Sequence, residues 1–198
     1  MAASDFIELP QPGREEALAL LGIARLAIAS RWDDRCRDEL SHAIGAMPLA
    51  NAVLACFVTL HEEGRLRGCI GCLEPQGPLR EALPHFARLA AFGDPRFPPL
   101  EPPELGGVSI SISLLGPLSP MEVEGRAELL ASLRPGIDGL WLMGGGRRAT
   151  FLPAVWRELP DPAAFLDHLL RKGGWPPGGW PEGLSVWRYR VREFAEEG

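Results

Sequence analysis

The segment Val108-Ser109-Ile110-Ser111-Ile112-Ser113-Leu114 alternates apolar and hydroxyl side chains. Because successive side chains of a strand point to opposite faces of a sheet, this segment predicts a β-strand with one buried and one polar face. Further strands are expected on both sides of it. An apolar run over residues 52–60 is followed by a short run over residues 65–72, which predicts a hairpin with its tip at residues 62–64.

A second hairpin is predicted later in the chain. The segments 139–143 and 148–152 flank three consecutive glycines, which adopt the positive φ angles of a tight turn at little cost. Near the end of the chain, residues 187–191 alternate aromatic or apolar side chains with arginines, which indicates a last strand.

Three segments have the spacing of amphipathic helices, and they cover residues 14–32, the stretch that begins at Pro78, and residues 161–172. Pro84 is expected to kink the second helix or to divide it into two short pieces. Strands joined by hairpins, with helices between groups of strands, predict an α+β fold with a largely antiparallel sheet and flanking helices.

Composition narrows the class of protein. The formal charge of −6 disfavours a broad phosphate-binding surface, so nucleic acid is not an expected partner. No signal peptide and no long apolar run is recognisable, so we expect a soluble, cytoplasmic protein that does not enter a membrane. The four cysteines are spread through a chain that needs no disulfide framework, and we expect them to be reduced.

The most chemically distinctive segment is Leu66-Arg67-Gly68-Cys69-Ile70-Gly71-Cys72. Cys69 is the candidate nucleophile, and Arg67, two residues away on the same face of a flat strand, is the candidate for tuning the acidity of its thiol. Gly68 and Gly71 are candidate ligand-binding positions, because glycine permits close approach to the backbone. The alternative is that Cys69 is a small buried side chain in a glycine-rich turn.

Cys69 and Cys72 also form a C-x-x-C motif, which occurs in redox pairs and in zinc sites. A zinc site requires a second ligand pair, and the remaining cysteines and histidines do not have that spacing, so no metal site is predicted. A thioredoxin-type pair lies at the start of a helix, whereas here the motif ends a hairpin strand. No nucleotide, flavin or haem motif reaches a convincing spacing either, so the cofactor stays unknown.

Residues 94–99, Asp94-Pro95-Arg96-Phe97-Pro98-Pro99, predict a stiff loop because residues before proline are restricted to extended geometry. Asp94 and Arg96 are candidate ligand-binding residues, since a guanidinium matches a carboxylate or a phosphate in bidentate fashion. The alternative is an internal bond between the two side chains that holds the loop. His61 and His85 are the histidines nearest in sequence to Cys69, but neither has a spacing that directs it toward the thiol.

The segments 57–60, 66–71 and 94–99, together with Ser109–Leu114, Gly136–Leu140, Leu152–Val155 and Leu169–Gly174, closely resemble the hallmark blocks of the AMMECR domain family, also called AmmeMemoRadiSam system protein A. The resemblance covers about residues 16–194. It implies a single domain over residues 14–194, with a larger and a smaller lobe that share a cleft. It further implies an association with a Memo-like protein and a radical SAM protein. The sequence departs from the family at Cys72, where a non-cysteine residue is usual, and at Ala154, where Gln or Glu is usual.

Two hypotheses of function follow. In the first, the chain is a cysteine-dependent enzyme or a component of a modification pathway that acts with the Memo-like and radical SAM proteins. In the second, it is a non-catalytic binding or adaptor protein that uses the same cleft for a peptide or protein partner. The sequence does not decide whether the chain is an enzyme, nor does it give the substrate, the reaction type or the oligomeric state.

Overall fold

The computed structural model describes residues 9–196, which form two compact units. Of these residues, the first unit contains 10–115 and 192–196, and the second contains Leu9 and 116–191. Each unit is built on a four-stranded sheet, and the pairings in both sheets are antiparallel. The predicted α+β fold with antiparallel strand pairing and flanking helices is therefore confirmed, and the strands form two sheets where one was predicted.

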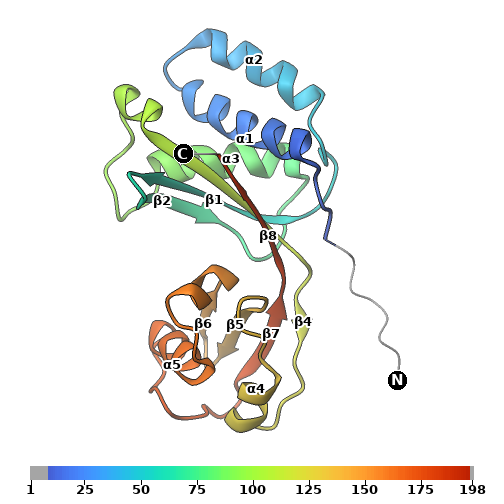
Figure 1. Ribbon diagram of the computed structural model, residues 1–198, viewed down its shortest axis with the longest axis vertical. Coiled ribbons are helices and arrows are strands. Elements are labelled where there is room, and N and C mark those ends of the chain that lie inside the picture. Colours follow the sequence, from blue (N-terminus) through green and yellow to red (C-terminus); the bar gives the residue numbers. More distant parts are fainter. Residues whose placement is uncertain (1–8, 197–198) are drawn as a thin grey trace. The chain divides into compact units, whose positions relative to one another are not determined.

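The first unit is a layered structure in which helices cover one face of the sheet (Figure 1). Its strands have the order β2-β1-β3-β8. Helices α1 and α3 pack on this sheet, and α2 packs on α1. The elements are α1 (Arg14–Ala29), α2 (Asp34–Gly45), β1 (Ala55–Glu62), β2 (Arg65–Gly71), α3 (Leu79–Phe92), the 3-10 helix η1 (Pro102–Gly106), β3 (Val108–Leu115) and β8 (Val191–Ala195).

The predicted first hairpin is confirmed as β1 and β2, with Glu63 and Gly64 at positive φ in the turn. The central strand β1 also pairs with β3, so that Thr59 lies opposite Cys69 on one side and opposite Ser111 on the other. Val58 in the same strand is buried, since it faces the helices. The hairpin thus places Cys69 on the sheet face that also carries Thr59 and Ser111.

Strand β3 differs from its prediction in one respect. The alternation of apolar residues and serines predicted one polar face, but Ser111 and Ser113 are only 6% and 5% exposed. The strand is therefore buried on both faces. Alternation in sequence shows that two faces differ in polarity, but it does not show what covers the polar one.

The helices of the first unit follow the predicted pattern except for α2. Helix α3 is one continuous helix that contains a buried Pro84, so proline does not divide it. Helix α2 was not predicted. Asp33 caps it by accepting a hydrogen bond from the backbone N–H of Arg35 at 2.9 Å, and Leu40 is its one buried side chain.

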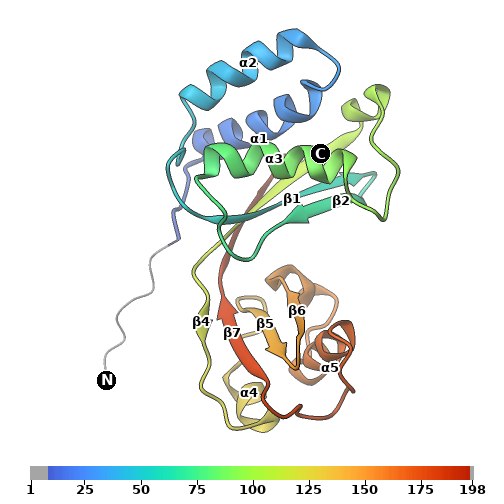
Figure 2. The ribbon, with the colours of Figure 1, turned by 180° about the vertical axis from the view of Figure 1, so that it is seen from behind.

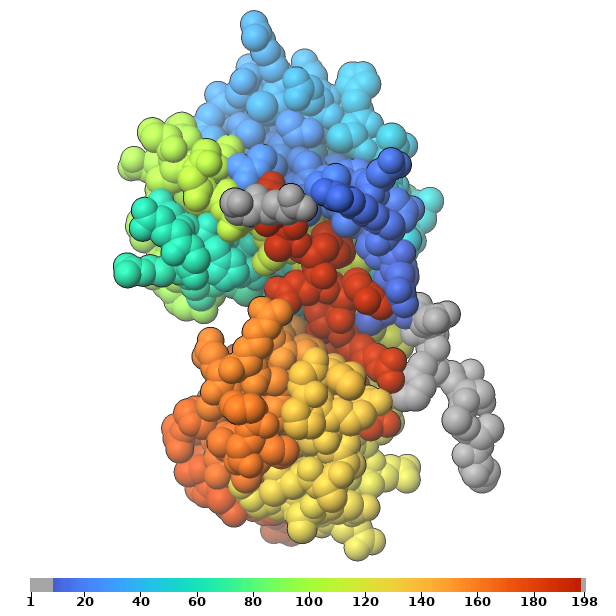
Figure 3. All heavy atoms as spheres, in the orientation of Figure 1, coloured from blue at the N-terminus to red at the C-terminus, as the bar shows by residue number. Residues whose placement is uncertain are grey.

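Strand β8 is an edge strand of the first sheet and lies next to β3. Figure 3 shows its atoms, in red, beside those of α1, in blue. The Glu196 carboxylate accepts hydrogen bonds from the Arg25 guanidinium and, at 2.8 Å, from the backbone N–H of Ile110. These bonds tie the end of the described chain to α1 and β3.

The second unit has the strand order β4-β7-β5-β6, and Figure 2 shows α5 beside β6. The predicted second hairpin is confirmed, with Gly145 and Gly146 at positive φ in its turn. The predicted last strand is divided at Arg190 into β7 and β8, which belong to different sheets. The elements are β4 (Ser119–Pro120), α4 (Arg126–Ser132), β5 (Gly139–Gly144), β6 (Arg147–Phe151), the 3-10 helix η2 (Pro153–Arg157), α5 (Pro162–Lys172) and β7 (Ser185–Tyr189).

No helix within residues 9–196 combines the length and the apolar character that a membrane span requires.

Candidate functional site

Cys69 lies in β2 with its thiol on the polar face of the first sheet. The Thr59 hydroxyl, directly opposite on β1, donates a hydrogen bond to the Cys69 sulfur at 3.2 Å. Cys69 is partly exposed, unlike Cys56, which is fully buried on β1. The sulfur of Cys69 therefore has a polar neighbour and is not sealed among aliphatic side chains.

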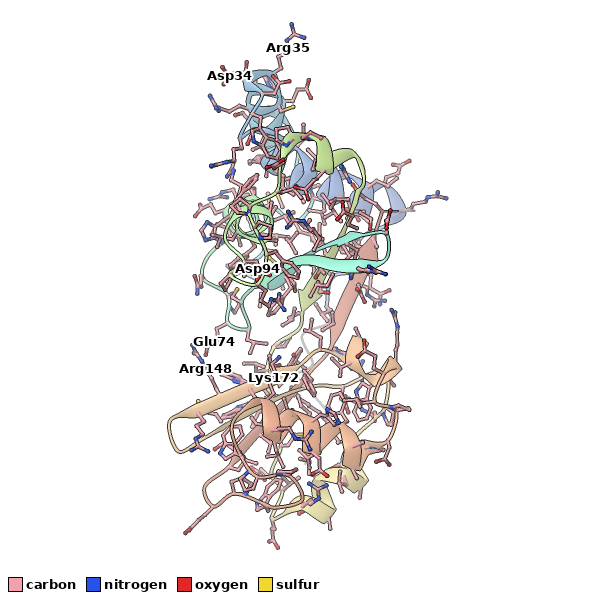
Figure 4. The ribbon with its side chains drawn as sticks, turned by 90° about the vertical axis from the view of Figure 1, so that its left-hand side faces the viewer. Asp34, Arg35, Glu74, Asp94, Arg148 and Lys172 are labelled. Carbon is pink, nitrogen blue, oxygen red and sulfur yellow. The ribbon has the colours of Figure 1, made fainter. Side chains whose placement is uncertain are left out.

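Asp94 binds the backbone of Cys69 from the loop that follows α3. Its carboxylate accepts a hydrogen bond from the Cys69 N–H at 2.9 Å, and Figure 4 shows Asp94 beside the strands of the hairpin. The same carboxylate accepts bonds from the Arg96 backbone N–H at 3.1 Å, from Arg96 Nε at 2.9 Å and from Arg96 Nη2 at 2.7 Å. The Asp94 side chain is only 2% exposed. Chiefly through the bonds from the Arg96 side chain, these donors hold the pKa of Asp94 far below its ordinary range, even though burial acts in the opposite direction.

Arg96 is the cation that contacts Cys69. Its Nη2 donates to the Cys69 carbonyl at 3.3 Å, and its side chain is 53% exposed. The pKa of Arg96 is raised, mainly by its bond to Asp94, and a charge interaction and a hydrogen bond with the Cys69 side chain add to this effect. The guanidinium thus touches the carboxylate of Asp94 on one side and Cys69 on the other.

Arg67, the predicted tuning residue, is held by other groups. The register of the hairpin shifts beside it, since Leu60 lies opposite Gly68 and His61 lies opposite Leu66, so Arg67 is the extra residue of a β-bulge. Its guanidinium donates to both carboxylate oxygens of Glu104, at 3.0 and 3.2 Å, and to the Pro98 carbonyl at 3.0 Å. The bond from Arg67 lowers the pKa of Glu104. This partly buried pair fixes the segment from Pro98 to Glu104 against the hairpin.

Gly68 and Gly71 are required for packing within the first unit. A Cβ atom on Gly68 would lie 2.1 Å from the Ala90 carbonyl oxygen of α3, and one on Gly71 would lie 2.2 Å from the Cys56 carbonyl oxygen. Both distances are far below van der Waals contact. The space that a side chain would need at these two positions is thus filled by the backbone of the protein itself.

Comparisons with known proteins give the family of this chain. The family model AMMECR1 matches residues 21–194. The chain belongs to the AMMECR1 family. A relative from Methanothermobacter thermautotrophicus is 38% identical over 93% of this chain and 96% of its own length, and MJ0810 of Methanocaldococcus jannaschii is 39% identical over 74% and 75%. The crystal structure of the uncharacterized protein PH0010 from Pyrococcus horikoshii superimposes with a TM-score of 0.78 at 29% identity, covering 92% of each chain.

In this AMMECR1-family chain, the C-x-x-C motif does not bring its two thiols together. The backbone N–H of Cys72 donates to the Cys56 carbonyl at 3.1 Å, which continues the ladder by one pair beyond Phe57 and Gly71. Side chains alternate along a strand, so Cys72 lies on the face of Cys56, and Cys69 lies on the opposite face. Burial raises the pKa of Cys56 to about 12, and the nearby Cys72 adds to this shift. Burial also raises the pKa of Cys72.

The two histidines nearest to Cys69 in sequence, His85 and His61, contact other groups. His85 is exposed on α3, and its ring lies 5.3 Å from that of Phe86. His61 lies on β1 opposite Leu66, and its carbonyl accepts a bond from the Ser109 hydroxyl at 3.4 Å. Within residues 9–196, no three His, Cys, Asp or Glu side chains gather in a geometry suited to a metal ion.

Proposed function

We propose that this AMMECR1-family protein acts through the Cys69 thiol, as a cysteine-dependent enzyme or a component of a modification pathway, with a Memo-like and a radical SAM protein as partners. One observation carries the proposal: the sulfur of a partly exposed cysteine receives a hydrogen bond from Thr59, and the carbonyl of the same cysteine receives one from the guanidinium of Arg96. A neighbouring cation and a hydrogen-bond donor both favour the thiolate, which is the nucleophilic form of cysteine.

In this proposal Asp94 is a positioning residue. Its carboxylate fixes the Arg96 side chain and the Cys69 backbone at the same time, so the cation and the sulfur keep a constant geometry. The thiol releases its proton to solvent, and the sulfur then uses its electron pair to form a bond to an electrophilic carbon, from which the leaving group departs with the bonding electrons. Arg96 also remains exposed enough to contact an anionic group of a substrate.

The test compares thiols within one molecule. The folded protein is treated briefly with iodoacetamide around neutral pH, and the modified cysteines are identified by peptide mapping. Cys69 is expected to react first. Cys36, which is partly exposed on α2, is the internal reference, because partial burial and the carboxylates of Asp33 and Glu39 raise its pKa.

Arg96→Gln is expected to slow the alkylation of Cys69 about tenfold, whereas Arg65→Gln, a change at an exposed position of the same strand, should leave the rate unchanged. If Cys69 in the folded protein reacts no faster than in the denatured chain, a reactive thiol is excluded.

Co-purification then tests for partners and bound ligands. A small molecule or protein that is retained by the native protein and lost from Cys69→Ala identifies what the site acts on.

A second candidate function is a non-catalytic adaptor. It is favoured by one observation, namely that Asp94 and Arg96 bind each other and the backbone of Cys69, so that the loop and the hairpin strand are held together as a rigid surface. The conservative change Cys69→Ser separates the two functions. An adaptor retains partner binding and cellular function, whereas a thiol-dependent reaction is lost although the protein stays folded and still binds its partner.

A further inference from the structure

A pocket of about 450 Å³ lies in the first unit, where the end of α1, the start of α2 and the last turn of α3 meet. Its lining includes three arginines, Arg31, Arg37 and Arg88, together with Ser30 and Phe92. None of these side chains takes part in the hydrogen bonds of Cys69, Asp94 and Arg96 described above. The pocket is therefore built from residues other than those of the thiol site.

Two of the arginines are anchored on the end of α1. Arg88 donates from Nε to the Ala27 carbonyl at 3.2 Å and from Nη2 to the Ser30 hydroxyl at 3.4 Å. Arg37 donates from Nη2 to the Ser30 carbonyl at 3.4 Å. Carbonyl groups at the end of a helix attract cations, so these contacts orient the guanidinium groups while each keeps further N–H donors.

The third arginine lies over an aromatic ring. The guanidinium carbon of Arg31 is 4.9 Å from the centre of the Phe92 ring. The Phe92 ring is itself held by Trp32. The two rings meet nearly at a right angle, with their centroids 5.3 Å apart. Cation–π contact of this kind holds a cation in place without neutralising its charge.

The pocket carries a positive charge that the protein itself leaves uncompensated. Asp34 is the carboxylate that pairs with Arg37, at 2.7 Å, and its side chain is 87% exposed at the start of α2, where Figure 4 shows it. Within residues 9–196, Arg31 and Arg88 have no carboxylate within salt-bridge distance. Three guanidinium groups and one carboxylate leave two net positive charges, in a chain whose overall charge is −6.

We propose that this pocket binds a phosphorylated small molecule. A phosphomonoester carries close to two negative charges at neutral pH, which balances the two net positive charges of the pocket. Guanidinium groups match phosphate oxygens in geometry as well as in charge. The volume lies in the lower half of the range for small-molecule sites, which suits a sugar phosphate better than a larger ligand.

Isothermal titration calorimetry with ribose 5-phosphate tests the assignment, with ribose, inorganic phosphate and citrate as comparison ligands. We expect ribose 5-phosphate and inorganic phosphate to bind, ribose not to bind, and citrate to bind more weakly. Arg88→Gln and Arg37→Gln should each weaken the binding of ribose 5-phosphate at least tenfold. Arg35→Gln, a change on the same helix at a residue outside the pocket lining, should leave it unchanged.

Two results would overturn the assignment. In the first, Arg88→Gln and Arg37→Gln weaken the binding of ribose 5-phosphate no more than the control Arg35→Gln does. In the second, citrate binds more tightly than the phosphates. Because Arg88 also contacts the end of α1, the fold of its variant is checked by circular dichroism; Arg37, whose side chain is 62% exposed, provides the variant with less risk to folding. The alkylation rate of Cys69 should not change in these variants, so this assignment fails or stands independently of the thiol chemistry.

Discussion

Replacing Asp94 tests how strongly one buried carboxylate holds the hairpin, the loop and Arg96 together. In Asp94→Asn, an amide oxygen in the place of Oδ2 still accepts the bonds from the Cys69 N–H and from Arg96 Nη2. The amide nitrogen then takes the place of Oδ1, so the bonds from the Arg96 backbone N–H and from Arg96 Nε are lost. A hydrogen bond to a charged group contributes roughly 1.5–3 kcal/mol. The Arg96 side chain is half exposed and regains water, so we expect Asp94→Asn to lower the free energy of unfolding by about 2 kcal/mol.

Asp94→Ala removes the acceptor for the Cys69 N–H as well. An unsatisfied buried donor costs about 1–3 kcal/mol, so the expected total is about 3–5 kcal/mol. Hydrogen exchange of peptides that cover β2 measures this opening locally. Since 1.4 kcal/mol corresponds to a factor of ten, exchange in the Asn variant should be roughly 30-fold faster than in the wild type. Glu128→Gln, a change at an exposed carboxylate of α4 in the other unit, is the control.

The pH dependence of this effect has a definite sign. The pKa of Asp94 is lower in the folded protein than in the unfolded chain, so its contribution is complete above a pH of about 4 and is lost as the pH falls below that value. The difference between wild type and Asp94→Asn should therefore shrink in acid. A difference below about 0.5 kcal/mol at neutral pH, or one that grows as the pH falls, would refute this account of the carboxylate.

Two further predictions concern the hairpin. Gly68→Ala should destabilise the first unit by more than about 2 kcal/mol in urea unfolding, because the added Cβ would collide with a backbone carbonyl of α3. Gly106→Ala, at a position where a Cβ would meet nothing within 4 Å, should leave the stability nearly unchanged. Equal effects of the two changes would contradict the packing argument. Mild oxidation of the folded protein by hydrogen peroxide should give no disulfide between Cys69 and Cys72, because their side chains lie on opposite faces of the sheet. Detection of such a disulfide by mass mapping of the native protein would refute this assignment of faces.

The elements that the sequence predicts well are those whose pattern is local. The first hairpin, strand β3, the glycine turn at residues 144–146 and the capped helix α5 all have periodicity or turn residues that suffice by themselves. Helices α2 and α4 lack such a pattern. Each buries one side chain, Leu40 and Leu129 respectively, so neither has an apolar stripe that the sequence can reveal.

The division of the last strand shows a different limit. The alternating residues 187–191 predict one strand, and the local geometry is extended on both sides of Arg190. Strand β7 nevertheless pairs in the second sheet and β8 in the first. An alternating pattern describes one strand and its two faces, but the choice of neighbouring strand depends on residues far away in the sequence.

In the candidate site, one arginine is a sequence neighbour of Cys69 and the other is distant in sequence, and the two show what local patterns can and cannot predict. Arg67 is close to Cys69 in sequence, and a regular strand would place both residues on one face; the β-bulge interrupts the strand there, and Glu104 and the Pro98 carbonyl bind the guanidinium instead. Arg96 is 27 residues away from Cys69, yet it binds the Cys69 carbonyl because the buried Asp94 holds it. Nothing in the spacing of residues 69 and 96 indicates this contact. A cation beside a strand residue therefore has to be sought in the loops that pack against the strand as well as among its sequence neighbours, and in this protein the proline-rich loop supplies it.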